Sequence, residues 1–210
     1  MTEPTTAYLD DSHKPQLWLL AGGNGAGKST FYQLFLQPLG VQFVNADLIA
    51  RKIAPEDPED ASYDAAKIAE YLRYDLLSQS VDFCFETVFS HSSKIDFVAA
   101  AKAKGYQIIL VFIHLENSTL NIARVSQRVN QGGHNVPNDK VINRIPRTLD
   151  AIKRTLPLVD EFHLLDNSSA EYPFKRLAVI KNQQLIQKED PLPDWASELI
   201  ATYSSFIPIA

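Results

Sequence analysis

The sequence predicts an α/β fold with three layers, in which helices cover both faces of a mostly parallel sheet of about five strands. Short apolar runs alternate along the chain with longer stretches whose apolar residues recur at helical spacing. The run 106–115 is apolar almost throughout, which is typical of a strand covered on both faces. The composition, with 45% hydrophobic and 21% charged residues, is that of a globular protein and excludes disordered and fibrous chains.

A domain has about 150 residues, so the length of 210 residues favours one medium-sized domain over two. We expect this domain to span residues 1–210, with a core at about 16–167 and a hairpin and helix at about 174–206. No repeat of solenoid length is present in the sequence, so a stacked-repeat architecture is not favoured.

The first half of the chain predicts three strands and two helices. The apolar run 16–21 ends in glycines and is followed by a helical stretch at 28–37 that stops before Pro38. Strands are expected at 41–45 and 81–86, and the segment between them contains a helix. The apolar face of that helix is expected to include Ala61, Ala65, Ile68, Tyr71, Leu72 and Leu76.

The second half continues the alternation of helix and strand. A helix at 92–104 should end at Gly105, before the apolar strand at 106–115. Helical spacing returns at 119–131 and at 138–159, where Pro146 is expected to kink or restart the helix. The last strand of the parallel sheet is predicted at 162–166; the remaining segments suggest a hairpin, at 176–180 and 184–187, and a terminal helix at 195–203.

Charge and cysteine content limit the setting of the protein. The net charge of −5 argues against a surface that coats nucleic acid, but leaves small anionic ligands open. The single Cys84 cannot form an intramolecular disulfide, which favours a reducing compartment, with the cytoplasm as the expected one. No export signal or membrane anchor is visible in the sequence.

A phosphate-binding loop is the most specific motif of the chain. It matches G-x-x-x-x-G-K-[ST] and lies between an apolar strand and a helix, as its mechanism requires. The expected nucleotide-binding residues are Gly22, Gly23, Asn24, Gly25, Ala26, Gly27, Lys28, Ser29 and Thr30. Glycines allow successive N–H groups to face one anion, Lys28 reaches the β- and γ-phosphates, and Ser29 is the expected Mg²⁺ ligand. The alternative is a glycine-rich turn that merely joins strand to helix.

The class of phosphate-loop protein follows from what accompanies the loop. A GTPase requires an Asn-Lys-x-Asp segment, which the sequence lacks, and a motor requires an acidic pair after a hydrophobic strand. Here Phe85 is followed by Glu86 and Thr87 instead. A small-molecule kinase with a P-loop fold is therefore favoured.

Two carboxylates are expected on the same edge of the sheet as the loop. Asp47 follows the second strand, and the carboxyl ends of parallel strands share one edge. We expect Asp47 to act as the base that takes the proton of an acceptor hydroxyl; the alternative is an N-cap of a helix beginning at Leu48. Glu86 and Thr87 are candidates for holding sugar hydroxyls or the water shell of the metal, or else form a structural pair with nearby arginines.

Arginines gather in the later helical region. Arg124 and Arg128 are four residues apart, Arg144 and Arg147 are three apart, and each pair lies on one side of a helix. Such guanidinium groups can neutralise a transferring phosphoryl group, and the glycine corner at 131–134, with His134, could bring them in as a lid. The alternative is a solvated helix face with ion pairs. The other histidines, His13, His91, His114 and His163, lack zinc-ligand spacing and are expected to be structural.

The motifs together resemble the zeta-toxin family of P-loop kinases. Besides the loop, they are 44–50 (VNADLIA), 85–87 (FET), 124–137 (RVSQRVNQGGHNVP) and 142–147 (INRIPR). The resemblance implies transfer of the γ-phosphate of ATP to the 3′-hydroxyl of the sugar in UDP-N-acetylglucosamine, by a toxin that an antitoxin holds silent. It also implies that Lys28 and Ser29 hold ATP and Mg²⁺, that Asp47 deprotonates the acceptor, and that Glu86 and Thr87 lie beside the sugar.

The lid arginines and the partner follow from the same resemblance. Arg128 and Arg144 are the closest matches to the residues that stabilise the transferred phosphate, with Arg147 as a substitute, while Arg124 and His134 are expected near the substrate. Fifteen residues before the first strand are too few for an antitoxin domain, so any antitoxin is expected to be a separate chain, or else the enzyme is not a toxin. Two alternatives remain: a kinase of another hydroxylated metabolite or of a nucleic-acid end, which the acidic net charge disfavours, and an ATP-dependent binding module with little turnover.

Overall fold

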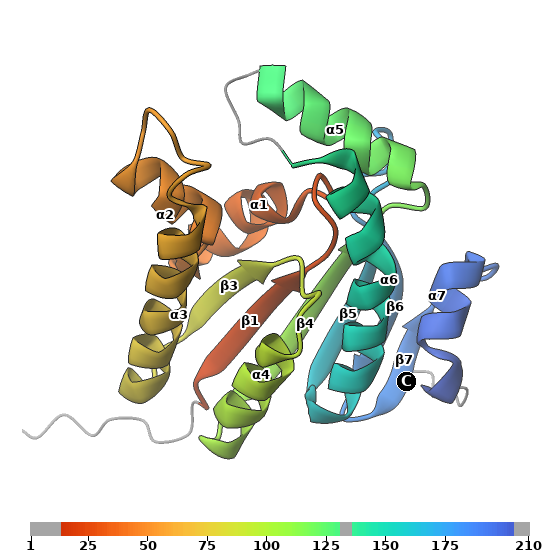
Figure 1. Ribbon diagram of the computed structural model, residues 1–210. Helices are drawn as coiled ribbons and strands as arrows, with labels where there is room; N and C mark the ends of the chain where they lie inside the picture. Colours follow the sequence, from red (N-terminus) through yellow and green to blue (C-terminus); the bar gives the residue numbers. More distant parts are fainter. Residues whose placement is uncertain (1–13, 131–135, 204–210) are drawn as a thin grey trace, which may run out of the picture.

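One sheet of seven strands forms the centre of the structure, a computed structural model that describes residues 14–130 and 136–203 (Figure 1). Its strand order is β2-β3-β1-β4-β5-β6-β7. The first five strands are parallel and the last two antiparallel. The strands are β1 (Gln16–Ala21), β2 (Gln42–Val44), β3 (Phe83–Thr87), β4 (Gln107–His114), β5 (Glu161–Asp166), β6 (Lys175–Lys181) and β7 (Gln184–Lys188).

The expected count of about five strands is therefore wrong for the whole sheet, although the mostly parallel α/β architecture is confirmed. The predicted hairpin continues the sheet from β5 instead of standing beside it. Its buried face explains why, because Leu177, Ala178 and Ile180 belong to the same apolar core as β1 and β4.

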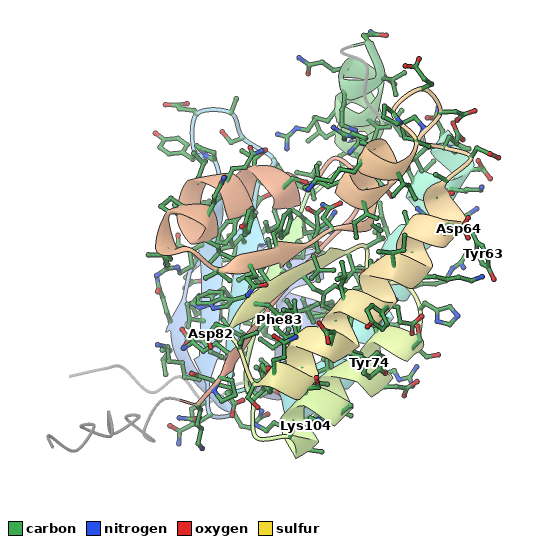
Figure 2. All side chains as sticks on the ribbon, turned by 90° about the vertical axis from the view of Figure 1, so that its left-hand side faces the viewer. Tyr63, Asp64, Tyr74, Asp82, Phe83 and Lys104 are labelled. Carbon is green, nitrogen blue, oxygen red and sulfur yellow. The ribbon has the colours of Figure 1, made fainter. Side chains whose placement is uncertain are left out.

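Helices cover both faces of this sheet. They are α1 (Lys28–Phe31), α2 (Ala46–Ile53), α3 (Ser62–Gln79), α4 (Ser93–Ala103), α5 (Ser118–Asn130), α6 (Asn138–Thr155) and α7 (Asp194–Leu199). Buried residues of α3, α4, α6 and α7 join one core cluster, whereas residues of α1, α5 and the π-helix Tyr32–Leu36 pack with a second cluster on the opposite face. Figure 2 shows the side that α3 covers, with Tyr63 and Asp64 near one end of the helix and Tyr74 nearer to the other.

Alternation along β1 produces the two faces. Leu17, Leu19 and Ala21 belong to the first cluster, whereas Leu20 belongs to the second, as expected when successive side chains point to opposite sides of a sheet. β4, expected to be covered on both faces, is buried from Ile108 to His114. No helix in the described parts of the chain is long and apolar enough to cross a membrane.

The ends of three strands are aligned by their register. Leu20 and Ala21 pair with Glu86 and Thr87, and Val44 pairs with Phe85. The segments that follow β1 and β2 therefore start beside the end of β3. This places the glycine loop, Asn45 and the Glu86 carboxylate at one edge of the sheet.

Two helices differ from the expectation. The predicted helix at 28–37 consists of α1, the π-helix and a 3₁₀ turn (Gln37–Leu39), with Pro38 in that turn. Of the kink or restart expected at Pro146, the restart is wrong, because α6 continues through the proline to Thr155. The hydroxyl of Thr148 donates to the carbonyl of Arg144 in α6 and also to that of Val88, which fixes the helix beside the end of β3.

Candidate active site

The glycine loop takes a conformation that other residues would not tolerate. Gly22 has a φ of +151°, and a Cβ there would lie 2.1 Å from the carbonyl oxygen of Ile113 in β4. Gly27 has a φ of +99°, and its Cβ would lie 2.5 Å from the side-chain nitrogen of Asn167. The backbone thus passes so close to its neighbours that only glycine fits.

Two buried asparagines hold the loop from outside. The Asn121 amide in α5 donates to the carbonyl oxygen of Asn24 over 2.7 Å, and the Asn167 amide after β5 donates to that of Ala26 over 2.8 Å. Arg124 in turn donates to the carbonyl of Asn167 over 2.8 Å. The loop is therefore fastened to the elements on one side of the cleft. Asn167 thus fixes the loop through its side chain.

Lys28 lies at the centre of a polar network. Its buried ammonium donates to the carbonyls of Gly22 and Gly23 over 3.0 Å each, and the Glu86 carboxylate lies 3.7 Å away. Burial lowers the pKa of Lys28, while the charges of Glu86 and Asp47 act against this shift. Both carboxylates are therefore close enough to act on the same ammonium.

Glu86 connects the loop to β2. One of its oxygens accepts from the Ser29 hydroxyl over 2.7 Å and from the Asn45 amide over 2.8 Å. Ser29 Oγ and a carboxylate are the hard oxygen donors that Mg²⁺ prefers. The residues present thus fit a magnesium ion held mainly by a bound phosphate and Ser29, with Glu86 beside it. The described residues contain no group of three or more His, Cys, Asp or Glu side chains suited to a metal.

Asp47 lies in the first turn of α2, half-buried. The side chain of Asn45, not Asp47, caps this helix by accepting from the N–H of Leu48 over 3.0 Å. The capping interpretation of Asp47 is therefore wrong. Its carboxylate instead lines the same cleft as Lys28.

A cleft of about 840 Å³ joins these groups, which is within the range of ligand sites. Of the expected site residues it is lined by Asn24, Gly25, Gly27, Lys28, Ser29, Thr30, Asp47, Glu86, Thr87, Arg124, Arg128 and Arg144. The Thr87 hydroxyl accepts from the N–H of Phe89 over 3.0 Å. Gly22, Gly23 and Ala26 do not line the cleft but form the buried base of the loop.

The arginines divide into two groups. Arg144 approaches the loop, with its guanidinium 3.4 Å from the side-chain oxygen of Asn24, and Arg124 and Arg128 line the cleft beside it. Arg147 is exposed, donates to the carbonyl of Asn143 and lines a separate depression with Arg154. The structure therefore does not bring Arg147 to the loop, because its side chain bonds to the carbonyl of Asn143 and lies in that other depression. His134 lies outside the described residues.

Several residues of the cleft had no sequence motif to mark them. Asn121 could have been noticed, because it precedes the buried Val125 by four residues and so is a polar residue on the apolar face of α5. Arg73 in α3 and Lys94 in α4 also line the cleft, on the side away from the glycine loop. No spacing distinguishes these two cations from solvated charges on helices.

Comparisons with known proteins identify the family of the chain. The model of the Zeta toxin family matches residues 2–171. An uncharacterized protein of Haemophilus influenzae is 32% identical over 135 residues, which are 61% of this chain and 96% of that protein.

Solved structures share the fold at low identity. A chain of the AvrRxo1-ORF1:-ORF2 complex with ATP has a TM-score of 0.68 and 19% identity, over 93% of this chain and 65% of that one. The PezAT chromosomal toxin-antitoxin system of Streptococcus pneumoniae gives a TM-score of 0.62 and 18% identity, over 91% of this chain and 84% of that one. The present chain thus spans slightly less than two thirds of the AvrRxo1 chain that it matches.

Proposed function

The chain belongs to the zeta-toxin family, and from this we propose that it is an ATP-dependent kinase that transfers the γ-phosphate to a sugar hydroxyl of a nucleotide sugar such as UDP-N-acetylglucosamine. The observation that carries the proposal is a single cleft shared by the glycine loop with Lys28, the Asp47 carboxylate and the three arginines of α5 and α6. Phosphoryl transfer needs an anion cradle, a proton acceptor and positive charge around the transferred group, and these are the groups present.

In this proposal the loop amides, Lys28 and Ser29 bind the triphosphate of ATP. Lys28 is held by the carbonyls of Gly22 and Gly23 and by Glu86, so its ammonium is oriented before ATP arrives. Bound Mg²⁺ would neutralise charge on the β- and γ-phosphates, with Ser29 as its ligand and Glu86 beside it. The ATP complex of the structurally similar AvrRxo1 chain supports the choice of nucleotide.

Asp47 then orients the acceptor hydroxyl and takes its proton as the oxygen attacks the γ-phosphorus. The bond between the γ-phosphorus and the β,γ-bridging oxygen breaks in the same step, and ADP leaves. Glu86 and Thr87 hold the sugar on the same side. Arg124, Arg128 and Arg144 meet the charge that develops on the transferred phosphoryl group. Arg147 has no role here, since it lies on another surface.

The biological setting is part of the same proposal. The family and the PezAT likeness support a toxin that a separate antitoxin chain holds inactive. A single buried thiol suits the reducing cytoplasm.

The experiment compares the wild type with Lys28→Ala, Asp47→Asn and the control Asp64→Asn, which alters an exposed carboxylate outside the cleft. Each protein is incubated with ATP, Mg²⁺ and either UDP-N-acetylglucosamine or a metabolite extract, and mass spectrometry detects products heavier by one phosphate. We expect kcat to fall about 100-fold or more in Asp47→Asn with unchanged ATP affinity, as for a lost general base. Lys28→Ala should lose ATP binding, and Asp64→Asn should behave as the wild type.

The outcomes are distinct. Full activity of Asp47→Asn would contradict the proposed role of Asp47 as the base. Transfer only to another metabolite would contradict the nucleotide sugar as acceptor but support the kinase activity. ATP-dependent exchange of a protein partner, with no phosphorylated product, favours a binding module.

A further inference from the structure

The cleft extends past the groups that the kinase proposal uses for ATP. Its nucleotide side is built from the loops after β1 and β5 and from α5. Its other side is built from α3 and from the segment that joins β3 to α4. Glu86, near the end of β3, and Asp47, in the first turn of α2 after β2, lie next to that second side, because β2 and β3 lie on the α3 side of β1 in the sheet.

Arg73 is the unusual residue of this second side. It lies in α3, its side chain is only 4% exposed, and it lines the cleft. The guanidinium lies over the rings of Phe85 and Phe97, 4.7 and 5.3 Å from their centroids. Its Nε has no hydrogen-bond partner within residues 14–130 and 136–203. A buried guanidinium nitrogen without a hydrogen bond is costly, so its presence calls for a function.

Lys94 adds a second cation to the same wall. It lies in the first turn of α4, half-buried, and also lines the cleft. Burial lowers the pKa of Lys94, and the charge of Arg73 lowers it further, so the two cations are near enough to repel each other. Glu70 acts on both, but forms no ion pair with either in the described parts of the chain.

We propose that Arg73 and Lys94 form a subsite that binds a phosphate or diphosphate group of the acceptor. This rests on the proposed function, because it assigns the far side of the same cleft to the acceptor and states which chemical class the acceptor belongs to. Two cations in one half-buried wall match a doubly charged group, and their N–H donors match its oxygens. Arg73 and Lys94 thereby select a phosphorylated sugar or a sugar nucleotide over a neutral sugar.

The first test needs no turnover. The wild type is saturated with a non-hydrolysable ATP analogue, so that the glycine loop is occupied, and calorimetry measures the binding of inorganic pyrophosphate. The variants are Arg73→Met, Arg73→Lys and Lys94→Gln. The control is Lys67→Gln, which removes an exposed cation of α3 outside the cleft.

We expect Arg73→Met and Lys94→Gln to weaken pyrophosphate binding about tenfold or more, since each removes a charge-assisted contact. Arg73→Lys should retain part of the affinity. If the guanidinium only packs on Phe85 and Phe97, the charge of residue 73 should not affect pyrophosphate binding. Lys67→Gln should bind as the wild type. Lys94→Gln keeps the test valid if Arg73→Met fails to fold. No pyrophosphate binding to the saturated wild type, or equal binding by all variants, overturns the proposal.

A second arm identifies the source of the phosphate. Binding of N-acetylglucosamine, its 1-phosphate and UDP-N-acetylglucosamine is compared in the same proteins. A loss in the variants for the 1-phosphate supports a monophosphate subsite, and a loss for UDP-N-acetylglucosamine alone supports a diphosphate subsite. Equal losses for neutral N-acetylglucosamine contradict the proposal. A kinase that phosphorylates nothing would refute the proposed function, yet Arg73 and Lys94 would still be measured as an anion site.

Discussion

Gly22 illustrates how one residue of the active-site loop depends on a strand far away in sequence. Its α-carbon faces the backbone of β4, and the space for a methyl group is already taken by the carbonyl of Ile113. The motif in the sequence marks this glycine, but only the packing shows what prevents its replacement.

We predict that Gly22→Ala destabilises the protein by about 2 kcal/mol or more, because a side chain forced into a filled space displaces the backbone. For a chain of this size the melting temperature should fall by roughly 4 °C or more. The control is Gly40→Ala, where φ is +74° but no atom lies within 4 Å, so only the left-handed strain remains. A Gly22→Ala protein no less stable than Gly40→Ala would contradict the predicted clash.

At the residue scale the sequence predicted the site better than its surroundings. The motif marked the glycine loop, and the rule that parallel strands end at one edge placed Asp47, Glu86 and Thr87 beside it. In the structure these three residues line one cleft, and their roles stay predictions. Arg147 was misplaced, because a spacing of three residues does not reveal which side of α6 faces the loop. Arg73 and Lys94 were missed, since their importance comes from burial.

Among the helices, α5 determines the shape of the loop. Its buried Asn121 lies four residues before the buried Val125, and its amide donates to the carbonyl of Asn24. The helix therefore acts on a loop almost one hundred residues earlier in the chain.

We predict that Asn121→Leu weakens ATP binding about tenfold, because the carbonyl of Asn24 loses its donor and the loop loses a fixed position. Nucleotide titration by calorimetry measures this change. Ser126→Ala, an exposed change on the same helix, should leave the affinity as it is. Unaltered ATP affinity in Asn121→Leu would show that α5 does not fix the loop.

The helix α6 contains a proline that costs it a backbone hydrogen bond. Pro146 is exposed within a helix that otherwise continues for eighteen residues. We predict that Pro146→Ala raises the free energy of unfolding by about 1 kcal/mol or more, because alanine restores an N–H and removes the ring's clash with the preceding turn. Denaturant titration measures it, with Asn143→Ala, exposed in the same helix, as the control. A decrease would mean that the proline holds α6 in a shape that packing requires.

At this scale the sequence located every parallel strand and most helices, because strand and helix differ in apolar period. It did not show that the hairpin joins the sheet. β6 pairs with the edge of β5 that the other parallel strands leave free, and the local sequence does not show which strand edge is free. Helix continuity through Pro146 was also hidden, because packing against the sheet outweighs the local preference.

The whole molecule carries a buried histidine beneath its C-terminal helix. His114, at the end of β4, is 7% exposed and lies 4.4 Å from the ring of Trp195, centroid to centroid. Burial lowers the pKa of His114 to about 4, and Asp166, the charged group that faces it, acts in the opposite direction. Because the folded-state pKa is below the unfolded value of 6.5, protonation favours the unfolded chain.

We predict that His114 contributes a loss of about 3 kcal/mol in stability as the pH falls from above 6.5 toward 4. Above 6.5 this contribution is fully present. Urea titrations at pH 7 and 4.5 measure it, and His114→Gln should reduce the difference between the two. The exposed His91→Gln should not reduce it. An identical pH slope in wild type and His114→Gln would refute this source of acid sensitivity.

Cys84 provides a reporter of how the sheet opens. Cys84 belongs to β3, which pairs with β1 and β2, and its thiol is fully buried in the second apolar cluster. Burial raises the pKa of this thiol well above the ordinary value. Alkylating reagents attack the thiolate, so the folded chain should react only during rare excursions that separate β3 from its neighbours. The alkylation rate of Cys84 therefore measures how often β3, the strand that carries Glu86, separates from the sheet. Saturating ATP should slow this alkylation, because ATP binds the folded protein.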